Sequence, residues 1–452
     1  MSEQTRYHSV RLDKERCRGC TNCLKHCPTE AIRVRGGRAH ILDSLCIDCG
    51  ECIRICDYHA KVAVTDALED IHRFRYAIAL PAPTLYGQFR TLKKPVYVLE
   101  ALKKIGFDDV FEVARGADVV TRAIRERLRD TSIPRPVISS ACPAVVRLIQ
   151  VRFPELLEHV IDIRQPMEVA ASIARRRFCK AHDCASEDVG CFFITPCPAK
   201  MTAIRRPIGQ AKSALDGAIS IMDIYGLLLP HVEAMQNDPD FVPATPYGVA
   251  WATSDGEANA VSPGSSLSVD GIPNVIRVLE EVENNKLRDL EYLEGNACIG
   301  GCVGGALVFE NNYVAKAAIR RLVADMPKRH PDTDVSAAML NKYPMKNDLP
   351  FEPNAAMRLD DNLVVAMQKM NRMNQIMDHL PGYDCGSCGS PTCKSFAEDI
   401  VRGFVASEMD CVHLMKEKIR HMAEDMVTLA QSAIDLGGKK EEHPEAANRS
   451  QK

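Results

Sequence analysis

From about residue 75, apolar runs along the chain alternate with amphipathic stretches. The segments with this character include Tyr76–Leu80, Val96–Lys104, Pro136–Ser140, Val189–Thr195 and Gly248–Ala252. Such alternation is typical of an α/β fold in which mostly parallel strands are buried between helices. Two of these segments lead into the pairs Cys142-Pro143 and Cys197-Pro198. Because ligands of open α/β sheets bind at the carboxyl ends of strands, we expect these two cysteines to lie near each other.

Changes in composition suggest further divisions of the chain. The N-terminal part has few apolar residues, and a proline-rich stretch at 343–356 indicates a linker. After this linker, a helical stretch around 357–378 is followed by a second cysteine-rich segment. We therefore predict a small α+β module over 1–72, an α/β domain over 73–345, a small mostly α domain over 356–411, a long helix over 412–436 and a disordered tail over 437–452.

The cysteine content is the least ordinary feature of the composition. The chain has 19 cysteines in 452 residues, and its N-terminus has no apolar segment of the kind found in secretory signals. We therefore expect a cytoplasmic protein with reduced thiols rather than a disulfide framework. The net charge of −3 gives no electrostatic reason to expect nucleic acid, and no apolar run is long enough to span a membrane.

The first eight cysteines form two near-copies of the spacing C-x2-C-x2-C-x3-C. Thiolates at this spacing are typical ligands of two-cluster ferredoxins, in which the fourth cysteine of each run binds the other cluster. Zinc would favour two separated C-x2-C pairs, and disulfides belong to short secreted domains. The sequence therefore predicts one 4Fe-4S cluster on Cys17, Cys20, Cys23 and Cys56, and a second on Cys27, Cys46, Cys49 and Cys52.

A third group of four cysteines is spread over three loops of the predicted α/β domain. The loops are Ser139-Ser140-Ala141-Cys142-Pro143, Thr195-Pro196-Cys197-Pro198-Ala199-Lys200 and Ala297-Cys298-Ile299-Gly300-Gly301-Cys302-Val303-Gly304-Gly305. One cluster held by three loops would be buried and fixed by the fold. The glycines on either side of Cys302 would let the backbone approach a bulky inorganic ligand. The alternative, that all four are ordinary core cysteines, fits this composition poorly.

These three loops resemble the motifs of the iron-only, di-iron hydrogenases: Thr-Ser-Cys-Cys-Pro, Pro-Cys-x-x-Lys and Ala-Cys-x-x-Gly-Cys-x-x-Gly-Gly. The resemblance runs from about residue 75 to about residue 340, with the last glycine pair one residue earlier than in the family pattern. It implies a hydrogenase-like domain of mixed and parallel sheets flanked by helices. It also implies a 4Fe-4S cubane on Cys142, Cys197, Cys298 and Cys302, with Cys302 bridging to a di-iron subsite that carries carbonyl, cyanide and a dithiolate. Lys200 would lie near a cyanide; the alternative is a solvated surface lysine.

Several positions depart from the family pattern. Ala141 stands where the family usually has the cysteine that passes protons, and the usual glutamates are missing from Val119–Arg127. Asn296 replaces a methionine, and Ala203 replaces a further glutamate. Since positioned proton transfer contributes about two to four powers of ten in rate, we expect slow turnover, or another proton path through Glu126, histidines or water. Such losses resemble divergent branches of the family related to sensory hydrogenases.

The C-terminal cysteines have the order C-x2-C-x4-C-x17-C. This pattern looks like a small 4Fe-4S domain, with three ligands in a glycine-rich loop and one at the far end of a helix over Lys394–Met409; zinc is the alternative. The ligands would be Cys385, Cys388, Cys393 and Cys411. No spacing ties Cys179, Cys184 or Cys191 to a cluster, and we interpret them as core or surface thiols.

Three functions fit the sequence. The first is a hydrogenase that catalyses 2H⁺ + 2e⁻ ⇌ H₂ with electrons from a ferredoxin or another redox protein, through four 4Fe-4S clusters and the di-iron subsite. The second is a hydrogen sensor that signals to a partner, and the third is an electron-transfer subunit without the di-iron subsite. After Cys411, an apolar stripe at alternating steps of three and four predicts a coiled-coil contact in a homodimer or with a partner, or packing on the chain's own α/β domain.

Overall fold

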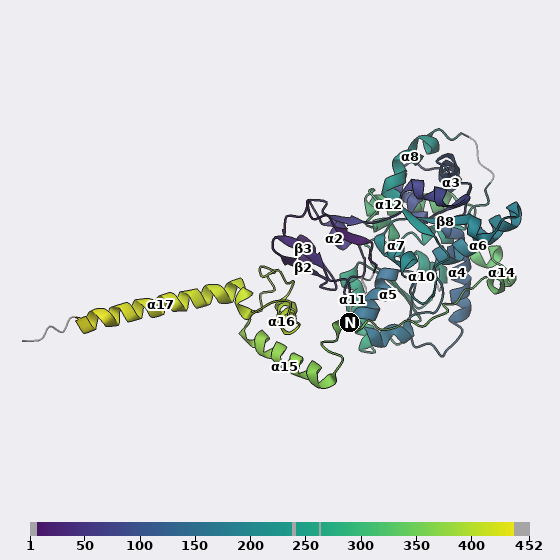
Figure 1. Ribbon diagram of the computed structural model, residues 1–452. Helices are drawn as coiled ribbons and strands as arrows, with labels where there is room; N and C mark the ends of the chain where they lie inside the picture. The colour runs from purple at the N-terminus through teal and green to yellow at the C-terminus, as the bar shows by residue number, and fades with distance from the viewer. Residues whose placement is uncertain (1–6, 237–240, 262–263, 438–452) are drawn as a thin grey trace, which may run out of the picture. The chain divides into compact units, whose positions relative to one another are not determined.

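The computed structural model describes residues 7–236, 241–261 and 264–437, and Figure 1 shows the arrangement of its helices and strands. The chain divides into two compact units, Met1–Arg358 and Leu359–Lys452. Apart from Gly437, which ends a helix, the predicted disordered tail lies outside the described residues.

The N-terminal module is built from two copies of a strand, a short helix and a second strand. Two antiparallel pairs of strands form its sheets: β1 (Val10–Leu12) with β4 (Lys61–Ala63), and β2 (Ile32–Arg35) with β3 (Arg38–Ile41). Its helices α1 (Asn22–Lys25) and α2 (Glu51–Arg54) each span four residues. The predicted α+β module is confirmed. It lies in the same compact unit as the following domain.

A four-stranded parallel sheet forms the centre of the first unit. Its order is β6 (Asp109–Val110), β5 (Tyr76–Pro81), β8 (Val189–Thr195) and β9 (Gly217–Ser220). Successive side chains of a strand point to opposite faces, so Ile78 and Phe193 enter one core while Ala79 and Phe192 enter the other. Both faces are covered, and β8 is therefore apolar at almost every position.

Helices cover both faces of this sheet. α4 (Val113–Arg127) and α6 (Pro166–His182) pack on one face, and α3 (Pro95–Lys104) and α8 (Ile221–Glu233) on the other. Further helices of the first unit are α7 (Pro198–Arg205), α9 (Pro246–Ala250), α10 (Gly256–Val261), α12 (Asn312–Asp325), α13 (Pro331–Asp334) and α14 (Ala337–Lys342).

A second parallel sheet has the order β10 (Ser266–Asp270), β11 (Tyr292–Asn296) and β7 (Val137–Ile138). It shares a core with α5 (Pro143–Arg152) and α11 (Ile272–Glu283). The predicted α/β class with parallel strands is thus confirmed. Of the segments named from the sequence, Val96–Lys104 lies in α3 and Gly248–Ala252 begins in α9, so these two belong to the helices of the α/β domain.

The segment expected as a linker follows the surface of the first unit. Backbone hydrogen bonds join Asn347 to Asp162, Leu349 to Gly209 and Asn354 to Gln150. The second unit contains α15 (Leu363–His379), α16 (Cys393–Val401) and α17 (Val412–Gly437). The predicted helix over Lys394–Met409 is wrong at its C-terminal end, because α16 ends at Val401 and the chain turns at Gly403 with a φ of 78°.

Candidate functional site

The first eight cysteines line two separate cavities, and the fourth cysteine of each run lies with the first three cysteines of the other run. The outer cluster site, as we call it, contains Cys17, Cys20, Cys23 and Cys56, and the inner cluster site contains Cys27, Cys46, Cys49 and Cys52. Cys20 is exposed, so the outer cluster site reaches the surface. The structure thus gathers each predicted set of four ligands in one place.

The two cluster sites repeat the same backbone with an offset of 29 residues. Each short helix begins after a residue in the left-handed region, Thr21 with a φ of 66° and Gly50 with a φ of 78°. The amide of Ala31 donates a 3.2 Å hydrogen bond to Cys27 Sγ, and the amide of Ala60 donates one of 3.3 Å to Cys56 Sγ. Hydrogen bonds from amides favour a charged sulfur acceptor, as a cluster-bound thiolate would be.

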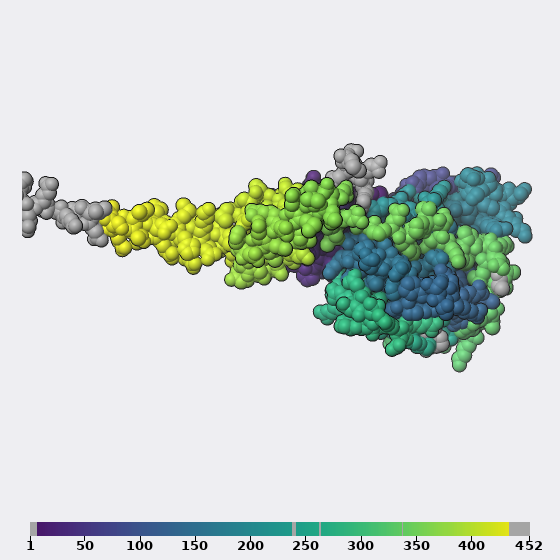
Figure 2. All heavy atoms as spheres, turned by 90° about the horizontal axis from the view of Figure 1, so that it is seen from below, coloured from purple at the N-terminus to yellow at the C-terminus, as the bar shows by residue number. Residues whose placement is uncertain are grey.

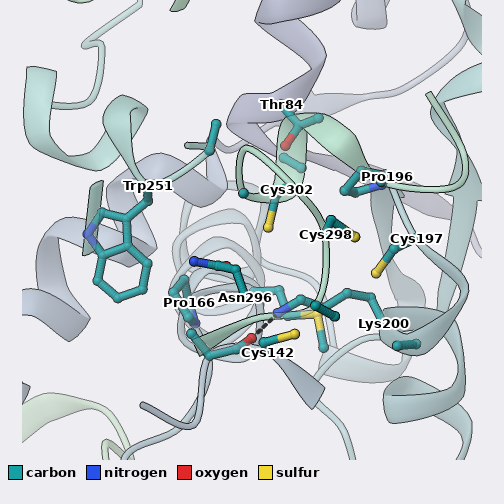
Figure 3. A pocket seen from close by; sticks show the side chains of 18 of the residues that line it. Thr84, Cys142, Pro166, Pro196, Cys197, Lys200, Trp251, Asn296, Cys298 and Cys302 are labelled. Atoms are coloured by element: carbon teal, nitrogen blue, oxygen red, sulfur yellow. Dashed lines mark hydrogen bonds between the residues drawn. The ribbon is translucent and has the colours of Figure 1, made fainter. Parts of the chain in front are cut away.

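The central site is a cavity at the carboxyl ends of strands from both larger sheets. Cys142 and Cys197 each precede a proline that begins a helix, α5 and α7 respectively, while Cys298 and Cys302 lie in the loop after β11. Figure 3 shows all four sulfur atoms around this cavity, with Lys200 and Asn296 beside them. Cys142 and Cys197, which follow β7 and β8, thus line one cavity, as expected from their positions after strands.

Burial makes the central thiols poor acids in the absence of a metal. It raises the pKa of Cys197 to about 12, and it also raises the pKa values of Cys142 and Cys302. A metal centre bound by these thiolates would offset this cost, because metal binding releases the thiol protons. Two buried donors that also line the cavity, Thr84 Oγ1 and Trp251 Nε1, have no hydrogen-bond partner among the described residues. The residues present therefore fit a large inorganic group with acceptor ligands.

The glycines beside Cys302 line the central site and also lie close to neighbouring backbone. A Cβ on Gly301 would lie 2.3 Å from the Ser254 amide nitrogen, and one on Gly305 would lie 2.3 Å from the Pro196 carbonyl oxygen. Gly301 also has a φ of 89°. These glycines let the Cys302 loop pack on neighbouring backbone.

Lys200 lies in the central site, so the interpretation as a solvated surface lysine is wrong. Its Nζ donates hydrogen bonds of 2.7 Å to the Ala141 carbonyl oxygen and 3.1 Å to Gln165 Oε1. This ammonium places a positive charge in the cavity that the four cysteines line, where it can stabilise a bound anion.

Two buried glutamates in the central site were not predicted from the sequence. Glu257, at the start of α10, and Glu294, on β11, both line the cavity. Glu257 Oε1 accepts hydrogen bonds from Ser139 Oγ at 2.8 Å and Tyr292 Oη at 2.7 Å. Glu294 accepts a 2.6 Å hydrogen bond from the Asn296 side chain.

Burial raises the pKa values of both glutamates. Burial and the neighbouring charge of Glu257 raise the pKa of Glu294 to about 8. The pKa of Glu257 is also raised, mainly by burial. A carboxyl group with a pKa of about 8, as at Glu294, can gain and lose a proton near neutral pH. A charged residue inside an apolar strand four positions before Cys298 was the sequence signal for Glu294.

The positions that depart from the family pattern have different surroundings. Ala141 lines the central site, and its amide donates a 3.1 Å hydrogen bond to Ser139 Oγ. Ala203 is buried in the core, whereas Glu126 is 46% exposed and pairs with Arg122. Glu126 is therefore not among the residues that line the central site.

The inner cluster site and the central site are neighbours. Cys49 lines both cavities, and no other cysteine of the N-terminal module does so within the described residues. Arg54 from α2 donates a 2.8 Å hydrogen bond to the Gly304 carbonyl oxygen, and its Nη1 lies 3.5 Å from Cys298 Sγ. The order of sites is outer, inner and central.

The C-terminal cysteines also line one cavity. It contains Cys385, Cys388, Cys393 and Cys411, with Cys411 placed by a short turn after α16 rather than by the helix itself. The Asp384 carboxylate accepts a 2.6 Å hydrogen bond from the Cys393 amide. Of the three remaining cysteines, Cys191 is fully buried in β8. Cys179, in the last turn of α6, lies near Cys184, which follows that helix. None of these three lines a described cluster cavity.

Three family models match parts of the chain. Residues 75–264 match the model described as iron only hydrogenase large subunit, C-terminal domain; residues 9–57 match a 4Fe-4S dicluster domain, and residues 380–413 match a model for an Fe-S cluster. The loop with Cys298 and Cys302 follows the first of these ranges. No helix among the described residues is long and apolar enough to cross a membrane.

Curated relatives are distant hydrogenases. The periplasmic Fe hydrogenase large subunit of Nitratidesulfovibrio vulgaris is 27% identical over 225 residues, which cover 46% of this chain and 53% of that protein. Iron hydrogenase 1 of Clostridium pasteurianum is 20% identical over 372 residues, which cover 66% of this chain and 65% of that protein. The NADP-reducing hydrogenase subunit HndD of Solidesulfovibrio fructosivorans is 22% identical over 233 residues, which cover 44% of this chain and 40% of that protein.

The chain therefore spans from 40% to 65% of the length of these three relatives. Among solved structures, a variant of the FeFe-hydrogenase HydA1 from Chlamydomonas reinhardtii has a TM-score of 0.49 and 15% sequence identity. That match covers 64% of this chain and 94% of the other.

Proposed function

The chain is a divergent iron-only hydrogenase-like protein, and we propose that it catalyses 2H⁺ + 2e⁻ ⇌ H₂ at the central site. The observation that carries this proposal is the position of Cys49, which lines both the inner cluster site and the central site. Electrons from the N-terminal module can thus reach a cavity that also contains two protonatable carboxyl groups.

Cys142, Cys197, Cys298 and Cys302 would hold a 4Fe-4S cubane, with Cys302 also bridging to the di-iron subsite. When bound, this group would supply the hydrogen chemistry. The chain's own residues have other tasks. Lys200 Nζ, held by the Ala141 carbonyl oxygen and Gln165, presents a positive charge to the cavity, and Thr84 and Trp251 offer it hydrogen-bond donors.

Protons would move through Glu257 and Glu294. Glu257 can hold a proton in the cavity wall, where Ser139 Oγ and Tyr292 Oη orient its carboxyl group. Glu294 lies beside it, and the two like charges resist ionising together, so one of them is readily protonated. Ala141 provides no proton-transferring side chain, which is why we expect turnover to be slow.

Electrons would enter at the outer cluster site and pass through the inner one. Cys20 is exposed, so a ferredoxin or another redox protein could dock where the outer cluster is nearest the surface. The cofactors would be four 4Fe-4S clusters and the di-iron subsite. A cytoplasmic location remains part of this proposal, and one of the relatives is described as periplasmic.

A hydrogen sensor is the second candidate, favoured by one observation in the second unit. α17 presents the exposed apolar side chains Met415, Ile419, Met422, Met426 and Leu429 along one stripe. Within that unit, Figure 2 shows α17, in yellow, extending beyond the green segments that precede it. Such a stripe fits a contact that transmits the state of the clusters to a second copy or a partner.

Hydrogen evolution from a reduced one-electron carrier tests the catalytic proposal. The matured protein should evolve hydrogen, whereas Cys302→Ser should not, although both keep the clusters of the N-terminal module. Equal rates for the two proteins would overturn the assignment of the central site. Matured protein that binds hydrogen without turnover would favour the sensor.

A further inference from the structure

The repeat in the N-terminal module places a lysine where its other copy has an isoleucine. The offset of 29 residues that relates Cys27 to Cys56 also relates Ile32 to Lys61. Ile32 is the first residue of β2 and lines the inner cluster site, whereas Lys61 is the first residue of β4 and lines the outer cluster site. One copy therefore has an apolar wall at this point and the other has a cation.

Lys61 is buried without a protein partner. Its residue exposure is 2%, close to the 1% of Ile32, and its Nζ makes no hydrogen bond to any described residue. An ammonium group in such a place costs several kcal/mol unless a negative charge compensates it. No carboxylate of the described residues forms an ion pair with Lys61, so the compensation has to come from elsewhere.

Lys61 lines the outer cluster site together with Cys23 and Cys56, and its charge also favours the thiolate forms of cysteines in the inner cluster site. Burial raises the pKa of Cys52 to about 12 and also that of Cys23, and in each case the charge of Lys61 is the main influence in the opposite direction. The charge of Lys61 also favours the thiolate of Cys27, although burial raises the pKa of that thiol overall. Cys23 belongs to the outer cluster site, and Cys27 and Cys52 belong to the inner one, so the ammonium acts on both.

We propose that Lys61 sets the reduction potentials of the two N-terminal clusters as a buried counter-charge shared between them. Lys61 acts on electron transfer through its charge and is not a catalytic residue. The proposal rests on the proposed function only in that both sites hold 4Fe-4S clusters.

Each cluster gains one negative charge when it accepts one electron from the carrier. A nearby positive charge in a medium of low dielectric constant stabilises the reduced cluster more than the oxidised one. Lys61 therefore raises both potentials, and it allows the second cluster to be reduced while the first already carries its electron. An isoleucine at this position would leave both clusters harder to reduce.

A potentiometric titration followed by electron paramagnetic resonance tests this inference. The full chain is loaded with iron and sulfide but not with the di-iron subsite, and dithionite is the reductant. Lys61→Met and Lys61→Ile should lower the reduced-to-oxidised ratio of the two N-terminal clusters about tenfold at a fixed potential, which is about 59 mV for a one-electron couple. Lys61→Arg, which keeps the charge, should shift the ratio much less.

Lys25→Met is the matched control, because Lys25 is exposed at the end of α1 and its loss changes the net charge equally. Unchanged potentials in fully loaded Lys61→Met, or an equal shift in Lys25→Met, would overturn the proposal. If Lys61→Met and Lys61→Ile load no iron in these sites, loading of Lys61→Arg would support the shared counter-charge, and failure of all three would contradict it. Hydrogen turnover plays no part in this titration, so failure of the proposed function would leave its result intact.

Discussion

Ser139 Oγ donates a 2.8 Å hydrogen bond to Glu257 Oε1 inside the central site, two residues before Ala141. This contact links the loop of Ala141 to a buried carboxyl group from a different segment of the chain. A glutamate therefore lies in the wall of the same cavity that Ala141 lines.

Glu257→Gln should lower hydrogen turnover by about two powers of ten or more, because the amide cannot exchange a proton at this position. The glutamine can still accept hydrogen bonds from Ser139 and Tyr292, so the cavity should keep its shape. Steady-state hydrogen evolution with an infrared check of the cluster measures this effect. Glu126→Gln is the control and should turn over normally; a similar loss in both variants would contradict the assignment.

Glu294 should make the protein less stable as the pH rises. In the folded protein its pKa is about 8, whereas a glutamate in an unfolded chain has a pKa of about 4.3. Between these values the folded state binds more protons than the unfolded state, so the free energy of unfolding falls with increasing pH. Glu294→Gln should remove part of this slope, as measured by the denaturant midpoint between about pH 5 and about pH 8. An unchanged slope in Glu294→Gln would mean that Glu294 titrates normally.

Ala141→Cys tests whether the missing thiol limits the rate. The new side chain would enter the central site beside Ser139, and turnover should rise. The increase should be smaller than the factor of about 100 that a complete proton relay can contribute. Ala141→Ser is a useful control because it adds a hydroxyl of similar size. An unchanged rate would point to Glu257 and Glu294 as a sufficient path, and a large fall with an intact cluster would contradict the alignment of the first motif.

The exposed stripe of α17 should form a coiled-coil contact between two copies of the chain. Ile419 is 59% exposed and Met426 is 69% exposed, so their burial in a dimer would remove apolar surface from water. Light scattering should give a dimer mass for the full chain and a monomer mass for a chain truncated after Cys411. Ile419→Glu should also give a monomer mass. A monomer mass for the full chain as well would contradict the dimer and indicate that the stripe contacts a different partner or the chain's own α/β domain.

The cysteine sites were largely predictable because their signals are local. The spacing of Cys17 to Cys56 contains the whole arrangement of two cluster sites, and the proline after Cys142 or Cys197 marks the start of a helix beyond a strand. The parallel strands β5 and β8 were likewise predicted, because strands buried on both faces are continuously apolar.

The two buried glutamates of the central site were not predictable in the same way. Glu257 and Glu294 are 37 positions apart, and only the packing of α10 against β11 brings them to one cavity. The end of α16 was missed because Gly403 was not recognised as a stop signal. The role proposed for Lys61 was not predictable either, because it depends on the burial of this side chain and on the comparison of Lys61 with Ile32 in the other copy.

Infrared spectroscopy of protein produced with its maturation system tests the central claim most directly, because carbonyl and cyanide absorb in a window free of protein bands. The account predicts these bands in the unmodified protein and in Cys191→Ser, whose cysteine lies in the core of β8 outside the cluster cavities. Cys302→Ser should lose the bands and retain the iron of the N-terminal module. Absence of the bands from the unmodified protein after verified maturation would contradict the account and leave an electron-transfer subunit without the di-iron subsite.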